Sequence, residues 1–283
     1  MLPGSGRKRA VPSNRMITHR YKGILETLYA RYNRRRYVHP DPLEFLYRYE
    51  DLLDREVAGL VAATLAVGRV EYILRSVACV LERLSDRPSR LLEGTNAAAL
   101  GRRLADCRHR FLTGEDLAAM LWGARQIQRR SGSIGAFFAA AVGPRDETVI
   151  PALGALVSEL CAAGGRCGRI LAHPCDKSAC KRLNLYLRWM VRSDAVDPGG
   201  WDAVSPRLLV VPLDTHMHRL GREMGLTKRR PANLATALEI TAAFRRIAPD
   251  DPVRYDFALT RLGIRDDTDR QGFLRQWCAA RVP

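Results

Sequence analysis

The sequence predicts an all-α protein built from many short helices. Apolar residues recur at steps of three and four along residues 70–84, which marks one buried helix face. Only the apolar run at 208–213 is typical of a strand, and Pro212 within it disfavours pairing in the middle of a sheet. With 283 residues, 47% of them apolar, the chain can bury a sizeable core, and a disordered chain is excluded.

The N-terminal half contains clear helix starts. Residues 16–36 can form a basic helix that ends in Arg34-Arg35-Arg36. Asp41 suits an N-cap and Pro42 the first helical position after it. Residues 113–116, Thr-Gly-Glu-Asp, open another helix, whose apolar stripe is Leu117, Met120, Leu121 and Ile127.

Residues 161–180 interrupt the helical pattern, because they are rich in glycine, cysteine and turn-forming residues. The next helix is predicted over 181–192. Its polar stripe contains Lys181, Asn184 and Arg188, since residues three and four apart share a helix face.

The C-terminal part carries three more helix starts. Asp214 is a candidate N-cap for a helix that runs to about Met224, and Asn233 begins another. Asp251-Pro252 begins the last clear helix, and Gly263 is the expected C-cap.

The charge of the chain indicates a polyanionic partner. Lys plus Arg total 46 and Asp plus Glu total 30, which gives +16 and a pI near 10.1. Residues 1–36 hold ten of the cations against one acid, and residues 1–19 are expected to form a flexible basic arm. Lysine is rare: only Lys8, Lys22, Lys177, Lys181 and Lys228 occur, and two of these fall within residues 177–181. Lysine, unlike arginine, can act as an amine nucleophile.

The cysteines and the hydropathy favour a cytoplasmic protein. Seven cysteines are an odd number, the start MLPGSGRKRAVPSNR is not a signal peptide, and no run of 18 apolar residues exists. We therefore expect free thiols in a reducing compartment and no membrane association.

The segment from Asp214 to His218 admits two interpretations. D-x-H-x-H after an apolar run is typical of the metal-binding strand end of a (β/α)8-barrel hydrolase. Such a barrel would need some two hundred residues after this segment. Only 65 residues follow His218. On a helix, Asp214 is instead an N-cap that shares a side with His218. We favour the helix.

A second group with metal-ligand chemistry is Cys161, Cys167, Cys175 and Cys180. Four thiols in twenty residues can hold zinc or an iron–sulfur cluster, but the spacing lacks tight C-x2-C pairs. Scattered free cysteines are the preferred interpretation, and no metal and no cofactor are predicted.

The turn Asp176-Lys177-Ser178-Ala179-Cys180-Lys181-Arg182 precedes the helix at 181–192. Cations at a helix start oppose the helix dipole, so a purely structural purpose is not evident. Such a turn can present backbone N–H groups to a phosphate, with the lysines and Arg182 adding charge.

Taken together, Lys181, the helix after it and PLDTHMHRL at 212–220 resemble the helix-hairpin-helix DNA glycosylases, nearest the archaeal 8-oxoguanine glycosylase/lyase branch. In that superfamily a helical hairpin ends in a catalytic lysine, and a later P-[VL]-D-x-H-x-x-R segment starts a helix with a catalytic aspartate. DKSACKR stands where the hallmark L-P-G-V-G would be. The chain from about 38 to 265 also resembles a bacterial family of unknown function, whose phrases here include HPDPLEFLYRY, SACKRLNLYLRWMVR and DPVRYDFALTRLGI.

The glycosylase resemblance implies a two-lobed helical fold with a degenerate helix-hairpin-helix. Within a single domain over 20–283, lobe A would span about 60–175, and lobe B about 20–59 plus 176–283. Residues 60–84 would be the first core helix pair.

The resemblance also implies a glycosylase/AP lyase that excises an oxidised purine from damaged double-stranded DNA. The protein would act as a monomer, with Lys181 forming a Schiff base and Asp214 stabilising the cationic sugar. The expected DNA-binding residues are Lys177, Arg182, Arg188, Arg69 and Arg219. The base pocket would contain Trp189, His216 and His218. The alternative is a DNA- or RNA-binding protein that keeps the fold without the chemistry.

Overall fold

The computed structural model describes residues 14–164, 170–265 and 267–280, and over these ranges it confirms the all-α prediction. The strands of this part of the chain are β1 (Arg108–His109) and β2 (Leu112–Thr113), which form one short antiparallel hairpin. The basic arm predicted over 1–19 lies largely outside the described residues, since the first described helix begins at Asn14.

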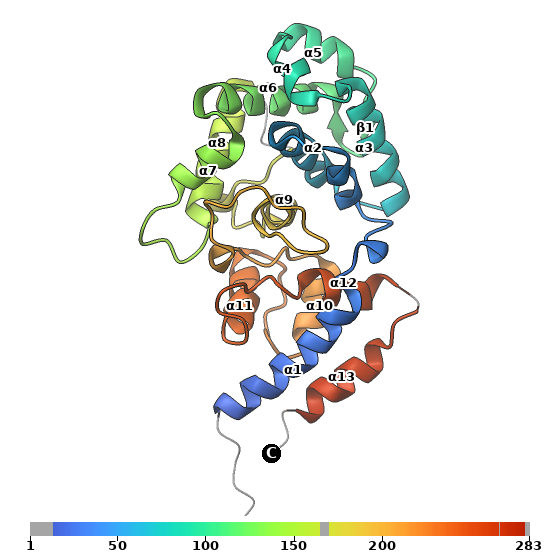
Figure 1. Cartoon of the computed structure of the whole chain (residues 1–283), viewed down its shortest axis with the longest axis vertical. Helices are drawn as coiled ribbons and strands as arrows, with labels where there is room; N and C mark the ends of the chain where they lie inside the picture. The colour runs from blue at the N-terminus through green and yellow to red at the C-terminus, as the bar shows by residue number, and fades with distance from the viewer. Residues whose placement is uncertain (1–13, 165–169, 266, 281–283) are drawn as a thin grey trace, which may run out of the picture.

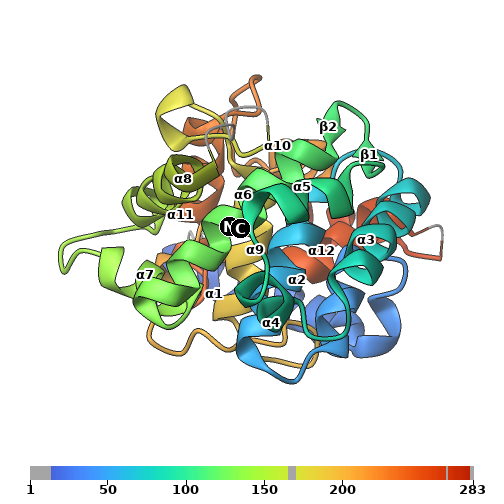
Figure 2. The same ribbon diagram turned by 90° about the horizontal axis from the view of Figure 1, so that it is seen from above.

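The helices form two groups with α9 (Lys181–Val191) between them (Figure 1). The upper group in that view is α2 (Leu52–Leu65), α3 (Val70–Leu84), α4 (Pro88–Glu93), α5 (Ala97–Leu104), α6 (Gly114–Ser131), α7 (Ile134–Ala141) and α8 (Ile150–Gly164). The lower group is α1 (Asn14–Tyr32), α10 (Thr215–Glu223), α11 (Leu234–Arg245), α12 (Asp256–Ile264) and α13 (Arg270–Ala279). Viewed from above, α7 and α8 lie on one side of the molecule and α3 on the other (Figure 2).

Short 3-10 helices complete the described elements: η1 (Arg35–Tyr37), η2 (Pro42–Arg48), η3 (Pro174–Asp176) and η4 (Pro206–Leu208). The predicted lobe boundary at residues 59 and 60 falls inside α2, which is one uninterrupted helix. The two segments η1 and η2 therefore carry the chain from the lower group to the upper one.

The core centres on α2 and α9, which pack against each other. Asp51 caps α2 by accepting hydrogen bonds from the backbone N–H groups of Leu53 and Asp54, and most residues after the first turn are buried. The Tyr186 hydroxyl on α9 donates to the carbonyl of Glu56 at 3.1 Å, which ties the two helices at their centre.

Glu56 is a buried acid that joins α2 to α7 and to the loop after α9. Its carboxylate accepts from the backbone N–H groups of Ile134 and Gly135 at the start of α7, from the Trp201 indole and from Gln128. Burial raises the pKa of Glu56, although these four hydrogen bonds oppose the shift. The carboxylate thus satisfies donors from three segments far apart in the sequence.

Several predicted boundaries hold, and two do not. The helices predicted at 181–192 and after Asp214 are confirmed as α9 and α10. The run 208–213 is not a strand: it follows η4 as irregular chain, and the N–H of Val211 donates to the Thr241 hydroxyl.

The last predicted helix also differs from the observed one. It begins at Asp256, not at Asp251, and continues through Gly263 to Ile264. Gly263 is therefore not a cap. Its missing side chain makes room for His216, whose Nδ1 would lie 3.1 Å from a Cβ at that position. A further helix, α13, follows.

Candidate functional site

A cavity of about 830 Å³ lies where both helix groups meet the start of α9. Its wall comes from the loop between α2 and α3, the N-terminal turn of α9, residues 212–216 at the start of α10, and α12. Apolar side chains from both groups line it, among them Ile73, Leu183, Leu185, Leu213 and Ile264. Lys181 and Asp214, which are 33 positions apart in the chain, both line this cavity.

Lys181 and Arg182 are held by the C-terminal end of α2. The Lys181 Nζ donates to the carbonyl of Ala66 at 3.1 Å, and the Arg182 guanidinium donates to the carbonyl of Thr64 at 2.9 Å. Carbonyls at a helix C-terminus lack partners and carry partial negative charge, so they stabilise cations. This contact compensates for placing two cations at the start of α9, and burial lowers the pKa of Arg182.

The turn before Lys181 is built from unusual backbone conformations. Lys177 and Cys180 have positive φ values of 58° and 46°. The carbonyl of Lys177 accepts from Leu234 N–H, and Ser178 bridges to Asn233, so the turn is docked against the start of α11. The element preceding α9 is only the three-residue η3, where the resemblance implies the first helix of a hairpin.

Asp214 caps α10 as predicted. Its Oδ1 accepts from Met217 N–H at 2.7 Å, and the described residues offer its Oδ2 no hydrogen-bond partner. The residue is partly exposed and lies at the cavity wall. One carboxylate oxygen is thus fixed by the helix while the other remains available to a ligand.

Asp256 and Arg188 also line the cavity, in its buried part. Asp256 is 2% exposed, and its Oδ2 accepts from the Arg188 guanidinium, while Oδ1 has no partner among the described residues. Burial raises the pKa of Asp256 to about 6; Arg188 offsets part of this shift, and the nearby charges of Asp214 and Asp197 add to it. Asp256 and Asp214 thus line the same cavity.

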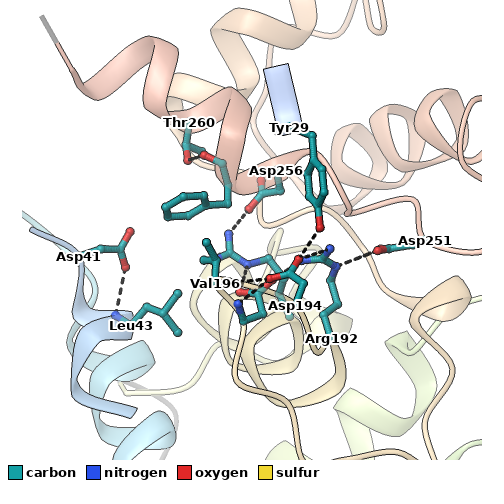
Figure 3. Close-up of polar contacts among 12 residues, drawn as sticks. Tyr29, Asp41, Leu43, Arg192, Asp194, Val196, Asp251, Asp256 and Thr260 are labelled. Carbon is teal, nitrogen blue, oxygen red and sulfur yellow. Dashed lines mark hydrogen bonds and ion pairs between the residues drawn. The ribbon is translucent and has the colours of Figure 1, made fainter. Parts of the chain in front are cut away.

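The ion pair of Arg188 extends into a larger network below α9. Asp197 accepts from both Arg188 and Arg192, and Arg192 also pairs with Asp194 and Asp251 at 2.8 and 2.9 Å. Figure 3 shows Arg192 reaching Asp251 and Asp194, with Tyr29 meeting Asp194 from α1. Although burial alone lowers the pKa of Arg188 and Arg192, the surrounding carboxylates raise it above the usual value.

The predicted DNA-binding residues fall into two sets. Lys177, Arg69 and Arg219 are exposed, as a phosphate contact requires. Arg188 is 2% exposed and is held by Asp197 and Asp256, so it does not face DNA as predicted. Arg182 is only partly exposed and contacts Thr64. Of the polar stripe of α9, Asn184 and Arg188 are buried and Arg188 binds carboxylates, whereas Lys181 is partly exposed and lines the cavity.

The predicted base-pocket residues also separate. His216 is exposed and lines the cavity. Trp189 is fully buried, has no part in the cavity wall and packs in the core, so its predicted stacking role does not fit its position. His218 has no part in the cavity wall, and its Nε2 contacts the carbonyl of Arg229 at 3.0 Å.

Sequence reasoning missed Asp256, Arg261 and the side chain of Asp41. Asp41 was expected only as a cap, and it does accept from Leu43 N–H, but its Oδ2 also accepts from Arg261 at 2.9 Å. All three line the cavity. The available signal was one acidic and one basic residue, Asp256 and Arg261, five positions apart in the otherwise apolar helix α12.

The cysteine group does not assemble in the part of the chain that the structure describes. Cys161, Cys175 and Cys180 differ in exposure, and Cys167 lies outside the described residues. No set of three His, Cys, Asp or Glu side chains with metal-binding geometry occurs in residues 14–164, 170–265 and 267–280. Nor does any helix in those ranges have the length and hydropathy of a membrane span.

Comparison with known proteins gives a family but no assigned activity. No curated protein and no solved structure matches the chain. Residues 41–265 match the family model described as "Protein of unknown function (DUF2400)". These residues contain the whole cavity lining except Pro40. Because the match covers most of the chain, the protein belongs to the DUF2400 family.

Proposed function

We propose that the protein is a DNA glycosylase with AP-lyase activity that acts on an oxidised purine in double-stranded DNA. The observation that supports this most is the shared cavity of Lys181 and Asp214. These are the two residues to which the resemblance assigns the chemistry, and binding alone requires neither. The cavity volume of about 830 Å³ falls within the range of small-molecule sites and can hold a flipped nucleotide.

In the proposed reaction the free amine of Lys181 attacks C1′ of the deoxyribose. The Nζ–C1′ bond forms while the glycosidic bond breaks, and the base leaves with the electron pair of that bond and takes up a proton. Loss of a proton from Nζ and opening of the sugar at O4′ then give the Schiff base, from which strand cleavage follows. The partnerless Oδ2 of Asp214 stabilises the positive charge on the sugar.

Borohydride trapping on duplex DNA containing 8-oxoguanine or an abasic site tests this proposal. We expect a covalent adduct with the wild type and none with Lys181→Gln. Lys228→Gln is the matched control, because Lys228 is exposed, lies outside the cavity wall and is not among the expected DNA-binding residues. No adduct with the wild type on either substrate, or equal adduct with Lys181→Gln, would exclude the lyase.

Asp214→Asn separates the role of the charge from the role of the cap. Asparagine caps helices as well as aspartate does, so α10 should remain intact. We expect base release to slow by about 100-fold or more, the loss typical of removing a group that stabilises charge in a transition state. An unchanged rate would show that Asp214 acts only as a cap.

A second candidate is a non-catalytic nucleic-acid-binding protein. The contact between Lys181 and Ala66 favours it, because a cation on the end of α2 has a structural role without any reaction. In this case Lys181→Gln would lower stability but would leave DNA binding unchanged, and no damaged oligonucleotide would be processed.

A further inference from the structure

Five exposed arginines border the chain where it passes from the end of α1 to the start of α2. They are Arg31, Arg34, Arg35, Arg36 and Arg48, called here the arginine cluster. None of them was among the residues expected to bind DNA, and none lines the cavity.

The arginine cluster has no carboxylate partners among the described residues. The two acids of residues 31–48 are already engaged: Asp41 pairs with Arg261, and Glu44 pairs with His39 at 2.8 Å. Glu50, Asp51 and Asp54 line the same hollow as Arg48, so the excess of positive charge lies chiefly at Arg31, Arg34, Arg35 and Arg36. An excess of positive charge attracts a polyanion.

Aromatic rings hold four of these guanidinium groups in place. Arg35 lies 3.7 Å from the centre of the Tyr47 ring, and Arg31, Arg36 and Arg48 lie 4.5–5.1 Å from the rings of Tyr32, Tyr37 and Phe45. A stacked guanidinium keeps its N–H donors, so it can still bind a phosphate in bidentate fashion. Because arginines occupy these ring faces, the rings are not free to stack on nucleobases.

The cluster is close to the cavity. Pro40 and Asp41 line the cavity, and only four residue steps separate Pro40 from Arg36. That stretch spans at most about 14 Å, at roughly 3.5 Å per residue. Successive base pairs rise by about 3.4 Å along the helix axis, so Arg36 lies within about four base-pair steps of Pro40 at the cavity wall.

We propose that the arginine cluster binds the phosphates of a nucleic-acid strand that flanks the cavity, without reading its bases. The inference does not depend on catalysis at Lys181, because it rests on charge, exposure and position alone. It assigns the segment from η1 to η2 a function besides linking the two helix groups.

Salt dependence of binding to an undamaged, fluorescein-labelled duplex tests the proposal. The variant carries Arg31→Gln, Arg35→Gln, Arg36→Gln and Arg48→Gln. Each lost phosphate contact reduces the magnitude of the negative slope of log K against log salt by about 0.9. For the four substitutions we expect the slope, measured between 50 and 200 mM salt, to be shallower than that of the wild type by about 3.6.

The control variant removes four charges elsewhere. Arg102, Arg103, Arg129 and Arg130 are exposed on α5 and at the end of α6, in the upper helix group (Figure 1). Their change to Gln lowers net charge equally and should leave the slope near that of the wild type. Both variants should retain the wild-type circular dichroism spectrum.

Equal slopes for the two variants would overturn the proposal. It would also be overturned if the cluster variant lost binding only to vesicles of anionic lipid, since the partner would then be a membrane. If the slope becomes shallower as expected but the wild type forms no borohydride adduct, the proposed activity fails and the phosphate-binding surface stands.

Discussion

Replacement of Asp256 by Asn should change how stability depends on pH. Asp256 has a pKa of about 6 in the folded protein, chiefly because it is buried. The ordinary aspartate value in an unfolded chain is about 3.9. The folded state therefore binds more protons than the unfolded state between these values, and the contribution of Asp256 to stability falls as pH rises from about 4 to 6.

The size of this effect follows from the difference between the two pKa values. A gap of about two units, at 1.36 kcal/mol per unit, gives about 3 kcal/mol at pH 7 relative to a pH well below 4, and about 2 kcal/mol of this falls between pH 4 and pH 7. Asparagine keeps the shape of the residue: its carbonyl oxygen can accept from Arg188, and its amide can occupy the position of the unpartnered Oδ1. The substitution thus removes the titration while the Arg188 hydrogen bond remains.

Urea unfolding of both proteins at pH 4.5, 5.5, 6.5 and 7.5 measures the difference. We expect Asp256→Asn to gain stability relative to the wild type as pH rises, by about 2 kcal/mol over this range. Glu26→Gln is a control of opposite sign. Burial of Glu26 is outweighed by hydrogen bonds from Arg254 and Tyr255, which lower its pKa, so its stabilising contribution is lost as pH falls. A pH-independent difference between the wild type and Asp256→Asn would refute the reasoning.

Two stability predictions concern the helix packing that supports the cavity. Glu56→Ala leaves three buried donors, the N–H groups of Ile134 and Gly135 and the Trp201 indole, without an acceptor, and urea unfolding should show a loss of about 4 kcal/mol. Glu159→Ala, at the surface pair with Arg130, should cost less than about 1 kcal/mol, and similar losses would contradict the central role of Glu56. Gly123→Ala places a Cβ 2.2 Å from the carbonyl oxygen of Leu160, so α6 and α8 must separate, at about 1–3 kcal/mol. A Cβ at Gly101 would meet open space, so Gly101→Ala should instead stabilise α5 by about 0.5–1 kcal/mol. Equal effects of the two substitutions in thermal unfolding would disprove the close approach of α6 and α8 at Gly123.

Helix starts were predictable because capping is a local signal. The Thr113–Asp116 segment caps α6 and Asn233 caps α11, as predicted, and Asp214 caps α10 within one residue of the predicted start. The start of α12 was misplaced since Asp251-Pro252 satisfies the same local rule. In the fold, Asp251 instead binds Arg192, 59 positions away, and the chain turns once more before the helix.

The environment of each helix face could not be predicted in the same way. Spacing by three and four placed Lys181, Asn184 and Arg188 on one face but did not indicate what covers that face. Arg188 is buried because α12 supplies Asp256, 68 positions beyond it, while the buried Asn184 amide donates to the Ala179 carbonyl. A pattern along one helix contains no information about a partner so distant in sequence, so it predicts a DNA contact at Arg188 where the fold has an ion pair.

The position of Lys181 is set by both helix groups at once. From above, α2 accepts its amine at the Ala66 carbonyl and binds α9 through Tyr186. From below, the ion pair of Arg188 and Asp256 joins α9 to α12. Gly263 of α12 in turn lies next to the His216 side chain of α10. The lysine and the aspartate of the candidate site therefore keep their relative positions without a direct contact. The distance between the two helix groups determines how wide the cavity opens. The buried ion pairs below α9 oppose a change in that distance, because breaking an ion pair would leave an uncompensated charge in a low-dielectric interior. The proposed reaction, in which the site would admit a flipped nucleotide and hold an amine near C1′, would need this rigidity more than a bond between the two reactive groups.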